Sequence, residues 1–287
     1  SAHGAQWIAA HHPDAIMADY VLTENGGLHT GTSERPYIGV NIGEKGVAWR
    51  KLRVKGTPGH GSAPFKSDNA LVRAAGVIQR LADYRPPAKF HELWRQQVGI
   101  LDVDEETKSI MLDADRIDDW LDAHPVEGVA RHFYSCTHTT FSPNLAESDR
   151  QMKTNVIPDQ IDINVDIRTL PGESTVEVQA HLDDALGDLA DQVEVEIIMN
   201  DPASVSQMDN PLWDTIQKAV NQPFPSARLS PQFIVGFTDA RVYRNLGSVA
   251  YGAGLFSPDL KSSDFMTRFH GHNERIDVES LSLTTQS

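Results

Sequence analysis

Strict alternation of apolar and polar residues marks two strands in the second half of the chain. The segments Ile161–Ile167 and Val193–Ile197 alternate in this way, as half-buried strands do. Between them, Ser174 and Glu177 have the spacing of a capping box that begins a helix. Apolar residues then recur at helical spacing, at Val178, Leu182, Leu186 and Leu189. This stretch therefore predicts a strand, a helix and a second strand.

An earlier stretch of the chain has a similar order of elements. Val47–Val54 predicts a strand, and a Thr-Pro-Gly turn follows it. A helix is predicted from about residue 68 to residue 83. Its expected inner stripe consists of four apolar residues, Leu71, Ala75, Ile78 and Leu81. His132–Phe141 is a further β-prone segment, and residues 86–129 are predicted to form a helical, acidic insertion. The two stretches together predict a ferredoxin-like split βαβ domain with two layers.

The flanking parts of the chain follow a different pattern. Ala15–Leu22 has the apolar character of a buried strand, and Val249–Tyr251 predicts a short strand before a Gly-Ala-Gly turn. Pro211–Val220 predicts a helix. Its inward residues are expected to be Leu212, Ile216 and Val220.

The chain length fits two domains, because 287 residues exceed what one compact core usually holds. We expect an α/β fold in which residues 1–42 and 205–287 form part of a catalytic α/β domain. Residues 43–204 would form an inserted lid and dimerisation domain.

Composition narrows the classes of partner. The chain is 40% hydrophobic and 23% charged, which is ordinary for a globular protein, and its net charge is −15. That charge argues against binding to nucleic acid or to an anionic membrane, because phosphates would be repelled. The single cysteine, Cys136, excludes an intrachain disulfide and suits the cytoplasm; its apolar neighbours favour a buried structural thiol.

Three polar motifs are candidates for chemistry. Glu24 follows a predicted strand, where open α/β sheets place their ligands, although an acidic residue before Gly-Gly is more often a solvated turn. Near the chain end, His270, His272 and Glu274 lie on one polar loop. Imidazole and carboxylate are zinc ligands, whereas an exposed loop is the simpler interpretation of one His-x-His pair. His60 lies between glycines, which leave its imidazole accessible to donate a hydrogen bond to an oxyanion.

Further polar residues suit an anionic substrate. Asn155 precedes a Val-Ile-Pro segment, Arg168 ends a predicted strand, and Thr238 and Arg241 belong to a Thr-Asp-Ala-Arg motif. Arginine pairs with a carboxylate through two hydrogen bonds, so these two arginines favour a substrate that ends in a carboxylate. Singly, each arginine is more often part of a structural salt bridge.

Five motifs occur in an order that resembles one family. They are ADYVLTENGG, KGTPGHGSAP, TNVIPDQIDINVDIRTLPG, FTDARVYRNLG and FHGHNERID. In this order they resemble the dinuclear zinc peptidases and deacylases, which include aminoacylase, acetylornithine deacetylase, succinyl-diaminopimelate desuccinylase and the glutamate carboxypeptidases. Each motif alone has low specificity; their order and spacing carry the resemblance.

The resemblance implies a role for each residue. Glu24 and His270 would bind one zinc ion each and would lie close together, and His272 would not be a ligand. His60 would reach the neighbouring subunit's active site and stabilise the tetrahedral intermediate. Asn155 would contact the substrate across the same dimer. The residues expected to hold the substrate are therefore Asn155, Arg168, Thr238 and Arg241.

The resemblance also implies what this sequence lacks. The family's His-x-Asp ligands, bridging Asp and Glu-Glu pair would precede Ser1, and His3, His11 and His12 do not match them. We therefore expect the chain alone to bind zinc weakly and to have no turnover. Phe237 stands where many relatives carry a small residue, which changes the expected pocket shape.

The leading hypothesis is a homodimeric hydrolase of amide bonds in small peptides or N-acyl amino acids. It would use two zinc ions, which cobalt or manganese could replace. The runner-up is a dimerising or ligand-binding module without catalysis. A third hypothesis is a hydrolase with one metal ion held by His270, His272 and Glu274.

Overall fold

The computed structural model describes residues 4–32, 34–124, 129–148, 152–260, 262–265, 267–268 and 272–286. The chain divides into two compact units. Unit 1 comprises residues 1–45, 88–137 and 204–287, and unit 2 comprises residues 46–87 and 138–203. Residues 88–137 thus group with unit 1, whereas the domain division expected from the sequence included them in the inserted domain. No helix in the described ranges is long and apolar enough to cross a membrane.

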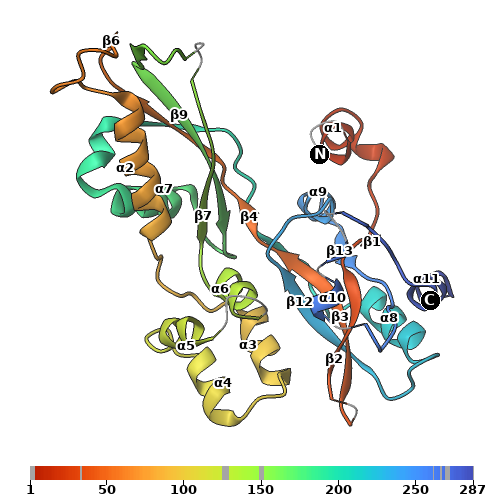
Figure 1. The fold of residues 1–287 in the computed structure, drawn as a ribbon. Helices are drawn as coiled ribbons and strands as arrows, with labels where there is room; N and C mark the ends of the chain where they lie inside the picture. The colour runs from red at the N-terminus through yellow and green to blue at the C-terminus, as the bar shows by residue number, and fades with distance from the viewer. Residues whose placement is uncertain are drawn as a thin grey trace. The chain divides into compact units, whose positions relative to one another are not determined.

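Unit 2 has the ferredoxin-like order that the sequence predicts (Figure 1). Its strands are β4 (Gly46–Val47), β5 (Arg50–Lys55), β6 (Gly59–His60), β7 (Thr140–Glu147), β8 (Val156–Ile157), β9 (Gln160–Thr169) and β10 (Val193–Ile197). Its helices are α2 (Ala70–Asp83), α7 (Thr175–Leu186) and the 3₁₀ helix η3 (Gly187–Gln192). The antiparallel sheet runs β10–β5–β9–β7, and β4 extends β5 along β9.

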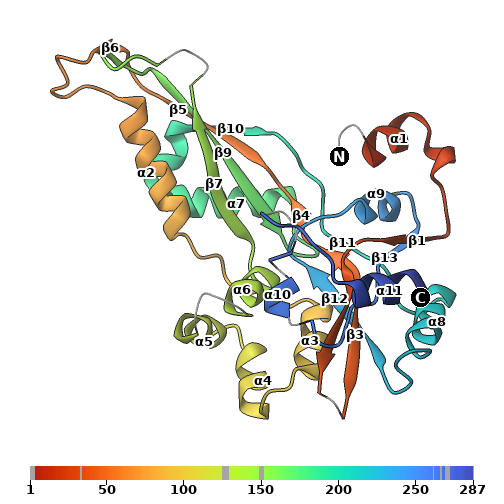
Figure 2. The same ribbon diagram turned by 45° about the vertical axis from the view of Figure 1, so that its right-hand side comes forward.

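Helices α2 and α7 pack on one face of the unit 2 sheet, where they bury the apolar side of the strands (Figure 2). The core includes Leu52, Ile163 and Leu182, all fully buried. Helix α7 begins at the predicted capping box, in which Ser174 and Glu177 each accept a hydrogen bond from the other's backbone N–H. The predictions for α7, β9 and β10 are confirmed.

Unit 1 is built on a six-stranded sheet with β3 at its centre. Its strands are β1 (Tyr20–Thr23), β2 (Gly26–Gly31), β3 (Pro36–Glu44), β11 (Ser204–Val205), β12 (Arg228–Ile234) and β13 (Val249–Gly252). Strand β12 pairs with β3 in parallel, and β1 pairs with β13 in parallel. Strands β2, β11 and β13 are antiparallel to β3. Seven consecutive residues of β3, from Ile38 to Glu44, are buried, because other elements cover both faces of this strand.

The helices of unit 1 surround this sheet and include the insertion. They are α1 (Ala5–His11), η1 (Pro13–Ala15), α3 (Glu92–Ile100), α4 (Glu105–Met111), α5 (Ile117–Ala123), α6 (Arg131–Thr137), α8 (Pro211–Val220), α9 (Ala240–Asn245), α10 (Ser262–Phe265) and α11 (Val278–Gln286). The helical character predicted for residues 86–129 is confirmed by α3, α4 and α5. Helix α8 has the predicted bounds, and Ile216 and Val220 are buried along it.

Three predictions of local structure are wrong in part. Ala15–Leu22 is a strand only from Tyr20, and Tyr20 and Leu22 lie on one face of β1 that is exposed. The inner stripe of α2 consists of Ala70, Ala74, Val77 and Leu81. Of the predicted stripe, Leu71 and Ala75 are therefore exposed. Most of His132–Phe141 belongs to helix α6 rather than to a strand.

Candidate active site

Glu24 lies in the turn between β1 and β2, with its side chain exposed. Two close approaches of backbone hold this turn against the end of β13. A side chain on Gly26 would collide with the Gly252 carbonyl oxygen, and one on Gly27, whose φ is 90°, would collide with Gly254. The glycines are therefore required by packing as well as by the turn. They fix the backbone beside Glu24 and leave its carboxylate in solvent.

His60 and Asn155 lie close to each other in unit 2. They lie on a small antiparallel ribbon at one end of unit 2 (Figures 1 and 2), in which His60 pairs with Val156. The backbone N–H of Gly61 donates to the Asn155 carbonyl oxygen at 2.8 Å. Both side chains are exposed.

The hydrogen bonds of His60 select one tautomer of its ring. Nδ1 accepts a hydrogen bond from the backbone N–H of Ser62 at 3.2 Å and lies 2.7 Å from the Ser62 hydroxyl oxygen. Because Nδ1 accepts, the proton of the neutral ring is on Nε2. His60 therefore presents Nε2–H to solvent as a donor, which is the arrangement that a role at an oxyanion requires.

Arg168 lies near the end of β9, between Val47 of β4 and Thr140 of β7. Its guanidinium forms two hydrogen bonds to Asp166, from Nε at 2.6 Å and from Nη2 at 3.0 Å. Trp49 Nε1 also donates to the same carboxylate, at 2.8 Å. Arg168 is thus engaged in a salt bridge within its own strand.

Thr238 and Arg241 are close together at the start of α9, and both are buried. Arg241 Nη1 donates to the Thr238 carbonyl oxygen at 3.4 Å. The Arg241 guanidinium also lies 4.3 Å from the centre of the Phe237 ring, a cation–π contact. Phe237 therefore covers the arginine, which shows one effect of the aromatic side chain noted in the sequence.

A buried ion pair that the sequence analysis missed supports this turn. Glu44 accepts hydrogen bonds from the backbone N–H of Thr238 and, at 3.2 Å, from its hydroxyl. The other carboxylate oxygen of Glu44 accepts from Arg244 Nη1 at 2.7 Å. Glu44 and Arg244 are 200 positions apart in the chain, so no local pattern could have paired them.

Burial disfavours the charge on both partners of this pair. It raises the pKa of Glu44, and Arg244 and then the Thr238 donors oppose that rise. Burial also lowers the pKa of Arg244, and Glu44 opposes that change. The two shifts agree in their main cause, which is the removal of both groups from water.

Some of the predicted metal-site residues lie outside the described part of the chain. His270 is one of them, so its predicted closeness to Glu24 stays a prediction, as does the one-metal hypothesis. His272 is described and is exposed. Cys136 is fully buried, and burial raises the pKa of its thiol to about 12, which confirms a structural thiol.

The described residues do not by themselves fit a zinc ion. Catalytic zinc normally has three protein ligands. Within the described ranges, no three or more His, Cys, Asp or Glu residues are grouped so as to hold a metal. Of the two predicted metal ligands, only Glu24 is among the described residues, and it offers a carboxylate oxygen.

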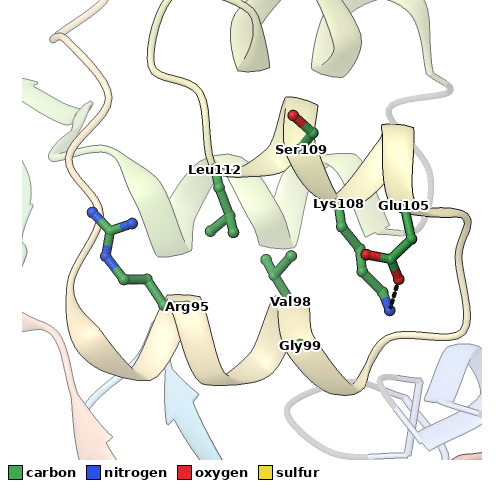
Figure 3. Close-up of a pocket in the computed structure, with 7 residues that line it drawn as sticks. All are labelled: Arg95, Val98, Gly99, Glu105, Lys108, Ser109 and Leu112. Atoms are coloured by element: carbon green, nitrogen blue, oxygen red, sulfur yellow. Dashed lines mark hydrogen bonds and ion pairs between the residues drawn. The ribbon is translucent and has the colours of Figure 1, made fainter.

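A cavity of about 430 Å³ lies between α3 and α4 (Figure 3). Its lining includes Val98 and Leu112 with Arg95 at one end, and Lys108 pairs with Glu105 at 2.9 Å. None of the candidate site residues lines it, so it has no part in the site described above.

Comparison with known families gives one match that spans 42–194. The matching family is described as a peptidase dimerisation domain. The matched range covers most of unit 2 and the insertion, and includes His60, Asn155 and Arg168.

Two curated relatives resemble the chain over most of its length. The N-fatty-acyl-amino acid synthase/hydrolase of Xenopus tropicalis is 27% identical over 280 residues, which are 95% of this chain and 52% of that protein. A probable carboxypeptidase S-like protein of Dictyostelium discoideum is 26% identical over 253 residues, which are 86% of this chain and 46% of that protein. The chain therefore spans about half the length of the relatives it matches.

Two solved structures share the fold. The M20 family metallo-carboxypeptidase of Sulfolobus solfataricus superposes with a TM-score of 0.56 at 18% identity, over 87% of this chain and 58% of that one. Human carnosine dipeptidase 1 superposes with a TM-score of 0.58 at 11% identity, over 91% of this chain and 58% of that one. Both likenesses support an α/β fold with an inserted second domain.

Proposed function

Because the chain belongs to the M20 metallopeptidase family, we propose that a protein carrying it hydrolyses amide bonds in small peptides or N-acyl amino acids. The observation that carries this proposal is the match to the peptidase dimerisation domain over 42–194, more than half of the chain. The Arg241 guanidinium beside Thr238 and the exposed Nε2–H of His60 support this proposal. We also propose a cytoplasmic location, because a chain with a single cysteine has no intrachain disulfide and suits a reducing compartment.

In this proposal zinc is the metal, and Glu24 and His270 contribute one ligand each. Bound zinc would polarise the scissile carbonyl and lower the pKa of a bound water. The further ligands and the general base would come from sequence other than this chain. The position of Glu24 at the end of a strand, with its backbone fixed by glycine packing, supports a ligand role.

Residues of this chain would hold the substrate and stabilise charge. Arg241, with Thr238 beside it, would bind the substrate carboxylate, and Arg168 and Asn155 would contact the substrate from unit 2. His60 would donate its Nε2–H to the oxygen that becomes negative in the tetrahedral intermediate. The accepting role of Nδ1 supports this assignment.

We also propose that unit 2 forms a homodimer, so that His60 of one chain serves the partner's metal site. Among the described strands, β7 and β10 are the edges of the unit 2 sheet. An open edge favours pairing with another chain, and a two-fold axis would cover it by identical contacts on both partners. A stable interface of this kind should bury at least about 1,000 Å².

The activity test compares two substrates and the metal. The full-length protein, loaded with zinc, is assayed on an N-acyl amino acid and on the same compound with a carboxamide in place of the carboxylate. We expect hydrolysis of the first that a chelator abolishes and added zinc restores. The kcat/KM for the carboxamide should be at least about tenfold lower than that for the carboxylate, because hydrogen bonds to a charged group contribute about 1.5–3 kcal/mol.

The alternative, a dimerising module without catalysis, predicts a different result. It keeps the dimerisation through unit 2 and removes the hydrolysis. A full-length protein that dimerises and holds zinc but hydrolyses neither amide would support this alternative and would overturn the proposed activity.

A further inference from the structure

Glu44 is a charged side chain to which the proposed function assigns no role. It is the last residue of β3, and only 1% of its surface is exposed. A carboxylate is almost never buried to this extent unless it is paired. Its partners therefore indicate what it does.

The partners of Glu44 converge on one turn. One carboxylate oxygen accepts from both the backbone N–H and the hydroxyl of Thr238. The Thr238 hydroxyl in turn accepts from the backbone N–H of Ala240 at 3.1 Å, and the Thr238 carbonyl accepts from Arg241. Glu44 thus fixes the backbone and the side chain of Thr238 together, and through Thr238 it fixes the position of Arg241.

Arg244 holds Glu44 itself in place. Its Nη1 donates to Glu44 at 2.7 Å, while Nε donates to Ser206 at 3.0 Å and Nη2 to the Ala250 carbonyl at 2.8 Å. The guanidinium therefore joins the end of β3 to β13 and to the segment after β11. Glu44 can neither rotate away from Thr238 nor move along the strand without breaking one of these bonds.

Stability alone does not account for this pair. Removing two charges from water costs free energy that their attraction often does not recover, and apolar residues of similar volume are often as stable. The raised pKa of Glu44 and the lowered pKa of Arg244 both reflect that cost. Apolar side chains at positions 44 and 244 could not hydrogen-bond to Thr238, so they could not fix its geometry.

We infer that Glu44 is a positioning residue, which holds Thr238 and Arg241 in the arrangement that binds the substrate carboxylate. This inference rests on the proposed function for the identity of the ligand. That Glu44 fixes the turn at Phe237–Arg241 follows from the hydrogen bonds alone and does not depend on the proposed function.

The test uses the full-length protein with Glu44→Gln, which keeps the shape of the side chain and removes its charge. Two measurements are made: amide hydrogen exchange across 236–241, and kcat and KM for the carboxylate and carboxamide substrates. We expect exchange in this segment to become at least about tenfold faster. We also expect KM for the carboxylate substrate to rise about tenfold with little change in kcat, and KM for the carboxamide to stay nearly the same.

A matched control is available in unit 2. Glu173→Gln makes the same chemical change at another buried carboxylate, which accepts from the backbone N–H of Leu170 at 2.8 Å and from the Thr139 hydroxyl. It should leave both KM values and the exchange across 236–241 unchanged. If Glu44→Gln does not fold, Glu44→Asp replaces it. It keeps the negative charge, and its shorter side chain withdraws the carboxylate from Thr238.

The outcomes separate the two proposals. Unchanged exchange across 236–241 overturns the positioning role, whatever the activity. An equal loss on both substrates also overturns it, because a general structural defect would affect them alike. A wild-type protein that hydrolyses neither substrate, together with faster exchange in the variant, removes the proposed function and leaves the positioning role standing.

Discussion

Two pairs of candidate site residues, one from each unit, lie in opposite environments. In unit 2, His60 and Asn155 are exposed at a two-stranded ribbon. Among the described residues, the His60 ring hydrogen-bonds to Ser62, two residues away. In unit 1, Thr238 and Arg241 are buried and are tied to Glu44. The first pair presents its polar groups to solvent, and the second is enclosed in a hydrogen-bonded network.

This difference indicates how each set could reach a reactive geometry. Buried groups that are fixed by their own fold need no reorganisation when a ligand binds. An exposed histidine becomes desolvated and held in one orientation only when another protein surface packs against it. In the proposed homodimer, the second copy of the chain would supply that cover for His60.

The largest expected effect concerns the buried pair of unit 1. Arg244→Ala should lower the free energy of unfolding by about 3–5 kcal/mol, because it leaves the buried Glu44 carboxylate without its partner. The unit 2 counterpart is Lys55→Ala, which removes a 3.0 Å pair with Glu194 whose side chains are 67% and 56% exposed. That change should cost about 0.2–1 kcal/mol.

Urea unfolding of both variants, followed by the free energy extrapolated to water, provides the measurement. Equal losses for the two variants would break the distinction between a buried and a solvated set of charges. A loss at Arg244 below about 1 kcal/mol would show that the fold adapts to an unpaired Glu44.

The next effect concerns the exposed donor of unit 2. His60→Ala should lower kcat by about a hundredfold or more, the usual result of removing one oxyanion donor. Its unfolding free energy should change by less than about 0.5 kcal/mol, because His60 is exposed and makes few contacts. Ser62→Ala is the control, which removes one partner of Nδ1 and retains the imidazole.

Mixing two inactive variants tests whether His60 acts across a dimer. His60→Ala and Glu24→Ala should regain part of the activity when they are combined, because a mixed dimer contains one site with both native residues. No recovery after demonstrated subunit exchange would place His60 within its own chain's site or outside the site.

Much of the fold could be predicted from the sequence, because local signals and packing agreed there. The capping box at Ser174 and the alternation of β9 and β10 have meanings that do not depend on distant residues. In His132–Phe141, aromatic and β-branched residues favoured a strand, yet tertiary packing of Cys136 and Thr137 produced a helix. The Thr137 hydroxyl donates to the Phe133 carbonyl four residues earlier, which accommodates a β-branched residue in that helix.

The candidate site was predictable only in part. His60 and Asn155 could be named from short motifs, and the structure places Asn155 next to Val156, which pairs with His60. Their roles in a site stay predictions. The link from Glu44 to Thr238 spans 194 positions and follows no periodicity. Glu44 sits in a Gly-Glu-Lys-Gly stretch that reads as a solvated turn, whereas β12 and α9 bury it. Only the packed structure could reveal it.

The smallest expected effect compares how the two units cap a helix. In unit 1, Asp277 accepts from the backbone N–H and the hydroxyl of Ser280, both at 2.8 Å, and from Arg268 at 2.6 Å. These bonds, the Ser280 N–H first, lower the pKa of Asp277 from its ordinary value to about 2. In unit 2, the corresponding cap is the uncharged hydroxyl of Ser174. Ser174→Ala should destabilise its helix by about 1 kcal/mol at neutral pH, because alanine offers no capping oxygen. Asp277→Asn keeps a capping oxygen but loses the charge that accepts from Arg268 and Ser280, which should also cost about 1 kcal/mol.

Acid should separate these two variants. A carboxyl whose pKa is lowered on folding contributes stability above its unfolded pKa, and that stability is lost as the pH falls through the folded value. For Asp277 the window runs from about pH 4 down to about pH 2. The difference between wild type and Asp277→Asn, measured by amide-exchange protection in α11, should therefore shrink across this window. For Ser174→Ala, protection in α7 should change far less, because a serine hydroxyl does not titrate there. A constant Asp277→Asn difference down to pH 2 would show that Asp277 caps α11 by shape alone.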